Sequence, residues 1–589
     1  MLPAHEALPA HVTAILARGD GSHVQSPPRA LYLDLAENVA RQATAWQCDD
    51  GTIGDPHNAP GVESVTATAR YCAAVGHLLA AGRCADLLGP AARAMDRCIE
   101  QLAGHLRDGT QWPCANFNLK DMLVLYAAAR GRVEAAGHAR WREVLGGYQP
   151  EAVYFGHHNW LFYATAAEQL RIEQGLSDRV DWIDAVLDEQ APNWTAHGMY
   201  RDPGDPVTYD LTVRQSLAMM LRHGYSGRHE QWARETLRTA AQTTLLTTSP
   251  TGVVPFGGRS AQYQMQEGML AYLAEWQATQ EPEPRLAGAL RRTALLAAEA
   301  ASRWLLTEPY AVSKHRMSRR EPFFGQDGFA ADQNAQSGYG LLAANLFAGA
   351  WHVADEGIEP RPAPAEIGGC AIHLPDAFFR AWASHGGYHV QIDTRAQPGY
   401  DATGLGRIHR IGVPVELALN MPIPAQPKFA MPLEPAPRSV ALGPGWPTGG
   451  GWRWLSELTR GDAYDVRVSA VERCEALELR VRYGGDFGVV REVCSLSADG
   501  VRYEARVDGA KRIALQVPLL ETDGEARSEI ELTRGGARVR YRGHEYQVQV
   551  GGAQAARMEP WAAPNRNGIY RVAVFEAAGD RTECTLKLS

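Results

Sequence analysis

The chain has 589 residues, more than a single hydrophobic core of ordinary size accommodates, so the length predicts two or more domains. Hydrophobic residues make up 45% and charged residues 21%, values that exclude a disordered or a fibrous protein. The formal net charge of −9 argues against nucleic acid and anionic membranes as partners of the whole surface. No apolar run reaches the roughly 18 residues that a membrane helix needs.

The N-terminal segment, MLPAHEALPAHVTAILARGDG, lacks the basic start and the uninterrupted apolar stretch of a secretory signal. We therefore expect a cytoplasmic protein, or a periplasmic one if a leader has been removed. Nine cysteines lie between Cys48 and Cys584 without any C-x-x-C pair. This pattern predicts buried reduced thiols, and we expect no metal site and no cofactor.

Apolar residues recur at three- and four-residue spacing from about residue 30 to residue 355, which predicts ten or eleven helices without a strand between them. Gly82, Gly175 and Gly224 follow three of these segments, where a left-handed residue closes a helix. Most helices are expected to form antiparallel pairs. About six such pairs that close on themselves make an (α/α) toroid, whose inner helix ends form a cleft.

The Pro-rich segment EGIEPRPAPAEIGG, residues 356–369, predicts a linker between two domains. Beyond it the apolar period changes to two in short segments such as YHVQIDTR, VELALNM and IYRVAVFEA, which are separated by Gly, Asp and Asn. Such strands predict an antiparallel β-sandwich. The predicted fold class is thus multidomain, α then β, with an (α/α)6-type toroid over 1–355 and a β-sandwich over 370–589.

Polar and aromatic residues gather where the predicted loops of the helical half turn into helices. Four segments have this composition, WPCANFNLKDM, YFGHHNWLFY, MYRDPGDPVTYDLTVRQ and PFGGRSAQYQMQEG, and a fifth, YAVSKHRMSRREPFFGQDGF, is basic. Aromatic faces stack on sugar rings, whereas amides, histidines and arginines bind hydroxyls and carboxylates. The segments predict a sugar-binding cleft, and the residues expected to bind substrate are Asn118, His157, Trp160, Asp210, Arg214, Gln262, Gln266, Glu267, His315 and Arg316.

Structural roles stay open for several of these residues. Asn118 and Asp210 also suit helix caps, and Tyr209 also suits simple packing. The basic run from Lys314 to Arg320 also suits a solvated loop.

The segment GGRSAQYQ has a partial structural explanation, because its glycines allow a tight turn and Ser260 suits the cap of the next helix. Capping does not explain Arg259 or Tyr263. HHNW (157–160) likewise contains more polar groups than a helix cap requires.

The whole combination resembles the toroid-plus-sandwich polysaccharide lyases, the group that contains chondroitin, hyaluronate, alginate and heparinase II/III-type enzymes. The resemblance rests on the helical pairs, on HHNW, DPVTYDLTVRQ and PFGGRSAQYQ, and on the trailing β domain, which together cover nearly the whole chain. In such lyases an asparagine and a histidine near one helix start neutralise the uronate carboxylate, and a tyrosine about one helical pair later exchanges protons. The resemblance implies the first role for His158 and Asn159 and the second for Tyr209 or Tyr263. The order HHN leaves open which histidine points inward.

β-Elimination at a 4-linked uronate removes the proton on carbon 5, which is barely acidic until the adjacent carboxylate is neutralised. Tyrosine is a poor base at its ordinary pKa of about 10, so a nearby arginine must favour the phenolate. Arg214 near Tyr209, or Arg259 near Tyr263, offers that cation. The predicted catalytic residues are Tyr209, His158, Asn159, Arg259 and Tyr263.

A glycoside hydrolase on the same scaffold, such as a β-glucuronidase or an unsaturated uronyl hydrolase, is the main alternative. It needs a carboxylate pair, for which Asp210 and Glu267 are the candidates, with Asp202 and Asp327 in reserve. A non-catalytic carbohydrate-binding protein is a second alternative.

We expect a lyase that acts on uronate-containing oligosaccharides. Because no export signal is visible, short imported fragments and exo action are favoured. A homo-oligomer is compatible with the sequence.

Overall fold

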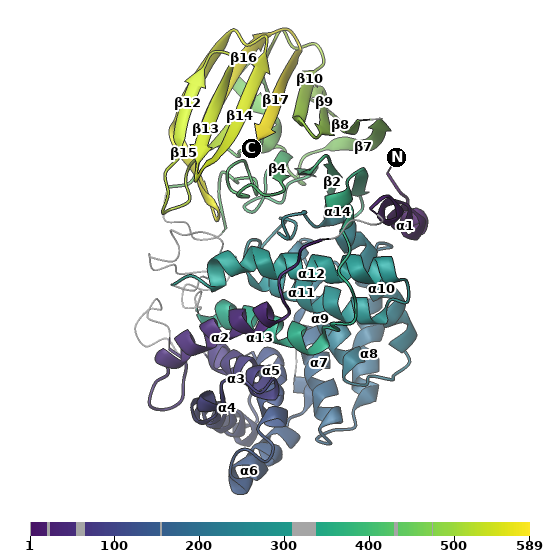
Figure 1. Cartoon of the computed structure of the whole chain (residues 1–589), viewed down its shortest axis with the longest axis vertical. Helices are drawn as coiled ribbons and strands as arrows, with labels where there is room; N and C mark the ends of the chain where they lie inside the picture. Colours follow the sequence, from purple (N-terminus) through teal and green to yellow (C-terminus); the bar gives the residue numbers. More distant parts are fainter. Residues whose placement is uncertain are drawn as a thin grey trace.

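The computed structural model describes residues 2–19, 24–54, 65–112, 114–152, 156–308, 337–428, 434–473 and 475–589. Helices make up the N-terminal part and antiparallel sheets the C-terminal part, with a small sheet between the two (Figure 1). Within the described ranges, no helix is both long enough and apolar enough to cross a membrane.

Among the described residues, six helices form a closed inner ring, because each contacts the next and the last contacts the first. They are α3 (Val65–Ala80), α5 (Ala115–Ala128), α7 (Trp160–Glu173), α9 (Val207–Arg222), α11 (Met265–Gln280) and α13 (Ser337–Val353). Every residue of α9 except Arg222 is buried. Because neighbours surround such a helix, its polar side chains need partners, as in the buried ion pair of Asp210 and Arg214.

An outer set of helices covers the ring. They are α2 (Ala30–Ala45), α4 (Leu88–Asp108), α6 (Ala135–Gly146), α8 (Val180–Gln190), α10 (Glu230–Thr247) and α12 (Pro284–Leu305). The outer helix α4 buries one stripe, which consists of Ala91, Ala94, Met95, Cys98, Ile99 and Leu102. The pairing of inner and outer helices confirms the predicted (α/α) toroid.

The predicted helix ends at three glycines are confirmed. Gly82, Gly175 and Gly224 follow α3, α7 and α9 with φ values of +76°, +66° and +85°. A residue with a Cβ would be strained at these angles.

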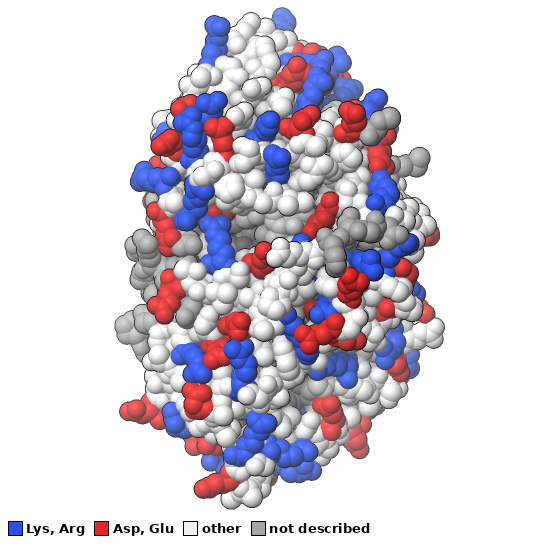
Figure 2. All heavy atoms as spheres, viewed as in Figure 1, with Lys and Arg blue, Asp and Glu red and all other residues white. Residues whose placement is uncertain are grey.

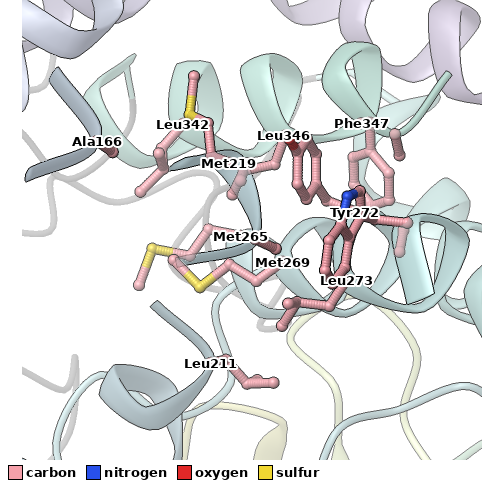
Figure 3. Packing of buried hydrophobic residues seen from close by; sticks show 14 of the residues in the cluster. Ala166, Leu211, Met219, Met265, Met269, Tyr272, Leu273, Leu342, Leu346 and Phe347 are labelled. Carbon is pink, nitrogen blue, oxygen red and sulfur yellow. The ribbon is translucent and has the colours of Figure 1, made fainter. Parts of the chain in front are cut away.

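The centre of the ring is filled by side chains from facing inner helices. Met219 of α9, Met265 and Met269 of α11, and Leu342 and Leu346 of α13 point toward one another (Figure 3). Flexible methionine side chains fit the irregular space between helices that splay apart around a ring. The ring is therefore a packed core and not an open channel at this depth.

The C-terminal strands form three antiparallel sheets within the described residues. The small sheet, in spatial order, is β1 (Cys370–Leu374), β2 (Arg380–His385), β3 (Tyr388–Asp393) and β4 (Gly404–Arg410). The largest sheet is β12 (Glu529–Thr533), β13 (Gly536–Tyr541), β14 (His544–Gly551), β17 (Arg581–Leu588), β10 (Gly500–Val507), β9 (Gly488–Ser497), β8 (Ala476–Gly485) and β7 (Tyr464–Arg473). The third sheet is β15 (Ala555–Asn565), β16 (Gly568–Ala578), β11 (Arg512–Thr522), β5 (Gly443–Thr448) and β6 (Gly451–Trp454).

The two larger sheets share one hydrophobic core, to which β8 contributes Leu479, β9 Leu496, β11 Val517 and β16 Val572, all fully buried. This arrangement confirms the predicted sandwich.

The segment VELALNM, residues 415–421, was predicted as a strand, and the structure shows that this was wrong. Its Glu416 carboxylate accepts hydrogen bonds from Arg303 of α12 (2.8 Å) and from the Tyr541 hydroxyl (2.7 Å). These tertiary contacts determine its course instead of a strand ladder.

The residues between α13 and β1, predicted as a linker, contain the short helix α14 (Pro364–Ile367) and pack against α12. Glu366 accepts from Arg292 of α12 at 2.7 Å, and the Arg361 N–H donates to the Gly288 carbonyl at 3.0 Å. The N-terminal helix α1 (Leu8–Arg18) contacts both α10 and α14. Several segments thus join the toroid to the sheets.

His389 on β3 makes stability depend on pH. It is wholly buried, and burial, reinforced by the Arg407 guanidinium, lowers its pKa from 6.5 to about 3. Between these two values the unfolded chain binds a proton that the folded chain does not. The free energy of unfolding should therefore fall as pH drops through this window, by up to about 1.4 kcal/mol per pH unit.

Urea unfolding at several pH values measures this slope. His389→Asn should flatten it, whereas His544→Asn, at a partly exposed position on β14, should not. An unchanged slope in His389→Asn would show that another group carries the acid sensitivity.

Candidate active site

The starts of three successive inner helices meet through Asp202, which lies in the segment before α9. Its Oδ1 accepts from the backbone N–H of Asn159 (2.8 Å) and from the Asn159 side-chain amide (2.9 Å), just before α7. Its Oδ2 accepts from Arg259, in the loop before α11. The Asp202 side chain is fully buried. Asp202, a reserve carboxylate of the hydrolase alternative, thus links the predicted segments HHNW and GGRSAQYQ.

Arg259 lies over the ring of Tyr209, with the guanidinium carbon 4.4 Å from the ring centre. It also donates to the Pro203 carbonyl at 3.0 Å. Burial lowers the pKa of Arg259, but Tyr209 and Asp202 more than offset this and leave the pKa raised, so the guanidinium stays charged. From the sequence we expected the phenolate-stabilising cation to be Arg214 for Tyr209, or Arg259 for Tyr263. The structure pairs Arg259 with Tyr209 instead.

The Tyr209 side chain is 8% exposed, and its hydroxyl lies 3.0 Å from Ser260 Oγ. Ser260 was predicted to cap the following helix. That prediction was wrong, because α11 begins at Met265 and Ser260 has a left-handed φ of +60°. The unusual backbone directs its hydroxyl to Tyr209.

His158 is the histidine joined to the Asn159–Asp202 pair. Its Nδ1 accepts from the Asn159 amide (3.2 Å) and from the Trp160 N–H (3.3 Å), which assigns the proton of the neutral ring to Nε2. Burial lowers the pKa of His158 and favours this neutral form, although the Asp202 charge opposes the shift. His157 is exposed and donates to the Arg201 carbonyl. Of the two histidines, His158 therefore fits the predicted role beside Asn159.

The small sheet holds the loop that carries Arg259. Gln391 of β3 accepts from the Phe256 N–H (3.2 Å) and donates to the Phe256 carbonyl (2.8 Å). Asp401 accepts from the Gly258 N–H (3.0 Å) and from Arg380 of β2 (2.7 Å). A Cβ on Gly258 would lie 2.8 Å from Pro206, so the tight approach to the segment before α9 requires glycine.

The turn between β15 and β16 reaches the same loop. Arg566 donates to the Ala261 carbonyl at 2.6 Å, and its guanidinium carbon lies 4.6 Å from the centre of the Tyr263 ring. On its other side Tyr263 stacks on Tyr339, with ring centres 5.1 Å apart and planes 2° from parallel. Tyr263 is wholly buried in this packing. The ring is thus held between Arg566 and Tyr339.

Gln262 and Gln266 bind each other and the neighbouring elements. The Gln262 N–H donates to Gln266 Oε1 (2.7 Å), and Gln266 donates to the Thr208 hydroxyl of α9 (2.6 Å). Gln262 Oε1 accepts from Asn420 at 3.0 Å. Both glutamines are wholly buried, so in this structure they brace the loop and do not present an open face to a ligand.

The carboxylate pair of the hydrolase alternative is also engaged in the structure. Asp210 accepts from the Tyr200 N–H (2.8 Å) and from Arg214 (2.6 Å), and Arg214 continues to the Thr244 hydroxyl of α10 (2.8 Å). Burial raises the pKa of Asp210, while the Arg214 charge opposes that shift. Glu267 accepts from the Val254 N–H at 3.2 Å. Asp210 and Glu267 are both wholly buried, and Arg214 is 4% exposed.

Aromatic residues border His158. Trp160 is partly exposed and meets His158 edge to face, with ring centres 4.7 Å apart. Asn116 of α5 donates to the Trp160 carbonyl at 3.2 Å, whereas Asn118 is wholly buried within the same helix.

The predicted ligands His315 and Arg316 and the reserve carboxylate Asp327 lie outside the described residues.

Among the residues that the structure describes, no group of three or more His, Cys, Asp or Glu side chains is placed to hold a metal ion.

No family model and no curated protein sequence matches the chain. Solved structures do match. A heparinase III crystal structure has 9% sequence identity and a TM-score of 0.53, covering 100% of this chain and 92% of that one. A heparan sulfate lyase from Pedobacter heparinus has 12% identity and a TM-score of 0.47, covering 99% of this chain and 88% of that one.

A family 88 glycosyl hydrolase from Bacteroides vulgatus has 12% identity and a TM-score of 0.40, covering 56% of this chain and 99% of that one. At such identities the likeness concerns the fold. The chain thus shares the toroid-plus-sandwich fold of heparinase III, and the fold implied by the resemblance is confirmed.

Gln391→Ala should loosen the Arg259 loop, because it leaves the Phe256 N–H and carbonyl buried without their side-chain partner. The expected loss in the free energy of unfolding is about 1–3 kcal/mol. Amide hydrogen exchange should accelerate in residues 254–264 more than elsewhere.

Gln547→Ala on β14 is the matched control, because among the described residues the hydrogen bond of that side chain goes to the nearby Glu545. Unchanged exchange in 254–264 after Gln391→Ala would contradict the clamp.

Proposed function

We propose that this chain is a carbohydrate-active enzyme, a lyase that cleaves a uronate-containing glycan by β-elimination at a 4-linked uronate. One observation carries the proposal: the Arg259 guanidinium, 4.4 Å from the centre of the Tyr209 ring, is bound through Asp202 to Asn159. This arrangement combines a tyrosine, a cation that favours its phenolate and an amide beside a neutral histidine. The fold shared with heparinase III supports the same class of chemistry.

Tyr209 is the proposed base. A guanidinium over the ring stabilises the phenolate, and the Ser260 hydroxyl, 3.0 Å from the Tyr209 oxygen, can donate a hydrogen bond to it. The phenolate takes the proton from carbon 5, and the C–H electron pair forms the double bond between carbons 4 and 5. The bond from carbon 4 to the glycosidic oxygen breaks, and that oxygen takes the proton back from Tyr209. No water is consumed.

His158 and Asn159 are proposed to bind the uronate carboxyl group. The neutral His158 ring offers its Nε2–H as a donor. Asn159 Oδ1 is buried and has no hydrogen-bond partner among the described residues. As an acceptor, it suits the hydroxyl of a carboxyl group that carries a proton. Holding the carboxyl in this uncharged form makes the carbon 5 proton easier to remove.

Close contacts at this site are proposed to recognise the anionic glycan. On the face shown in Figure 2, basic and acidic residues are interspersed over both halves of the molecule. Within the site the buried Asp202 charge balances Arg259. On this face, donors with fixed positions in the site are therefore proposed to select the substrate.

The two alternatives fit the geometry less well. A hydrolase that uses Asp210 and Glu267 would need both carboxylates available for proton transfer, but Asp210 is bound by Arg214 and the Tyr200 N–H, and Glu267 accepts from the Val254 N–H. A non-catalytic binding protein has no need of an arginine stacked on a tyrosine. Within the proposed class we keep exo action on short oligosaccharides as the expected mode.

Tyr209→Phe should lower kcat/KM by roughly 100- to 10,000-fold, because it removes the proton acceptor and leaves the ring in place. The ultraviolet absorbance of the new carboxyl-conjugated double bond measures turnover on a panel of uronate oligosaccharides. Calorimetric Kd values should stay within a few fold.

Tyr263→Phe is the matched control, since its ring packs between Arg566 and Tyr339. It should keep most of the activity. Full turnover in Tyr209→Phe together with loss in Tyr263→Phe would reverse the assignment of the base.

A further inference from the structure

A cavity of about 210 Å³ lies where the toroid meets the small sheet, outside the group around Tyr209. The segment between α8 and α9 and the turn between β1 and β2 form its walls, which include Trp194, Thr195, His197, Arg201, Asp376 and Phe378. A cavity of roughly 10–15 Å³ already holds one water molecule, so this one is far larger than a single-water site. It has room for a small organic group the size of one sugar ring.

The chemistry of the walls suits a ring with hydroxyl groups. Trp194 is partly exposed and supplies aromatic surface, and its indole N–H is buried with no hydrogen-bond partner among the described residues. Burial lowers the pKa of His197, so it stands as a neutral donor or acceptor. Asp376 is exposed, and its carboxylate can accept hydrogen bonds from a ligand. Flat apolar surface with a few convergent donors and acceptors is typical of small-ligand sites.

The charges in the walls favour a neutral ligand. Arg201 is 49% exposed, and its side chain donates to Asp205 at 3.1 Å, which balances its charge. Asp376 adds a negative charge, and Arg201 is the one Lys or Arg side chain among the residues that line the cavity. A sulfated or carboxylated ring would therefore meet no net attraction here.

The cavity wall is held in a strained backbone. Phe378 and Phe379 have left-handed φ values of +64° and +54°, which cost about 1–3 kcal/mol each. Arg380 donates to the Phe378 carbonyl, and the Thr394 N–H donates to the Phe379 carbonyl at 2.8 Å. Arg380 also binds Asp401, which clamps the Arg259 loop. One buried arginine thus supports both the cavity wall and the candidate active site.

Arg201 connects the cavity to that site directly. It lines the cavity, its carbonyl accepts from His157, and the next residue, Asp202, binds Asn159 and Arg259. We propose that the cavity is a subsite for one further, uncharged sugar ring of the glycan whose uronate is held at Tyr209. This inference rests on the proposed function.

Ala196→Trp tests the proposal, because Ala196 is an exposed part of the cavity lining and a large side chain there fills the space without removing a contact. The probes are tetra-, hexa- and octasaccharides prepared from heparan sulfate and from chondroitin. In the unsubstituted protein kcat/KM should rise with length until the subsite is occupied. Ala196→Trp should remove that gain, about tenfold on the longest chain, and leave the shortest substrate unaffected.

Asp376→Asn is a second variant at an exposed position and should give a smaller loss of the same kind. Ala136→Trp, at an exposed position on α6, is the control for a new surface tryptophan. The same length dependence in Ala196→Trp and the unsubstituted protein, with double-bond formation intact, would overturn the subsite and leave the proposed function standing.

If no probe yields a double bond, the proposed function fails. Calorimetric titration with the same oligosaccharides then tests whether the cavity binds a sugar ring. Weaker binding of the longer chains to Ala196→Trp than to Ala136→Trp supports the subsite. Equal affinity for both variants, or no binding to either, overturns it.

Discussion

The conformation of the loop from Phe256 to Gln262 is the constraint on which the candidate active site depends. Ser260 and Gln262 are both left-handed, with φ values of +60° and +71°, and such non-glycine residues cost about 1–3 kcal/mol each. The small sheet offsets this cost through Gln391 and Asp401. A loop of this kind would not hold its shape in an isolated toroid. The sheets are therefore part of the site and not an appendage to it.

Electrostatics fixes the remaining members of the site. Asp202 and Arg259 form a pair in which the aspartate is fully buried, and removing one partner of such a pair typically costs about 3–5 kcal/mol. Because Asp202 also binds Asn159, the same charge that holds Arg259 over Tyr209 orients the amide beside His158. Dipoles and charges that are already in place need no reorganisation during the reaction. The arrangement thus suits a reaction whose difficulty is the stabilisation of a carbanion-like transition state.

Periodicity along the chain predicts most of this architecture, because helices that line a ring and strands that pair in a sandwich are set by local patterns of apolar residues. HHNW also stands out in sequence, since a helix start does not need two histidines. The sequence does not reveal the role of the carboxylates. Asp210 and Glu267 lie at helix starts and were candidates for a catalytic pair, but in the structure both accept hydrogen bonds from backbone N–H groups. Sequence spacing alone cannot separate a carboxylate that braces a loop from one that faces a ligand.

The sequence analysis did not identify the residues that hold the Arg259 loop, because they lie far from that loop along the chain. Gln391 and Asn420 contact the Arg259 loop across more than a hundred positions, and Arg566 does so across 305. No local pattern marks such contacts. The sequence also could not predict that Arg259 stacks on Tyr209 and not beside Tyr263. This contact accompanies the left-handed backbone at Ser260, which no local pattern marks.

The central claim is that bond cleavage occurs by elimination at a uronate. The most direct measurement is the mass of both products when the purified protein is incubated with a single uronate oligosaccharide. Elimination predicts that the two product masses add up to the mass of the substrate, with one product containing a double bond. Product masses that add up to the substrate plus one water would establish hydrolysis and contradict the account.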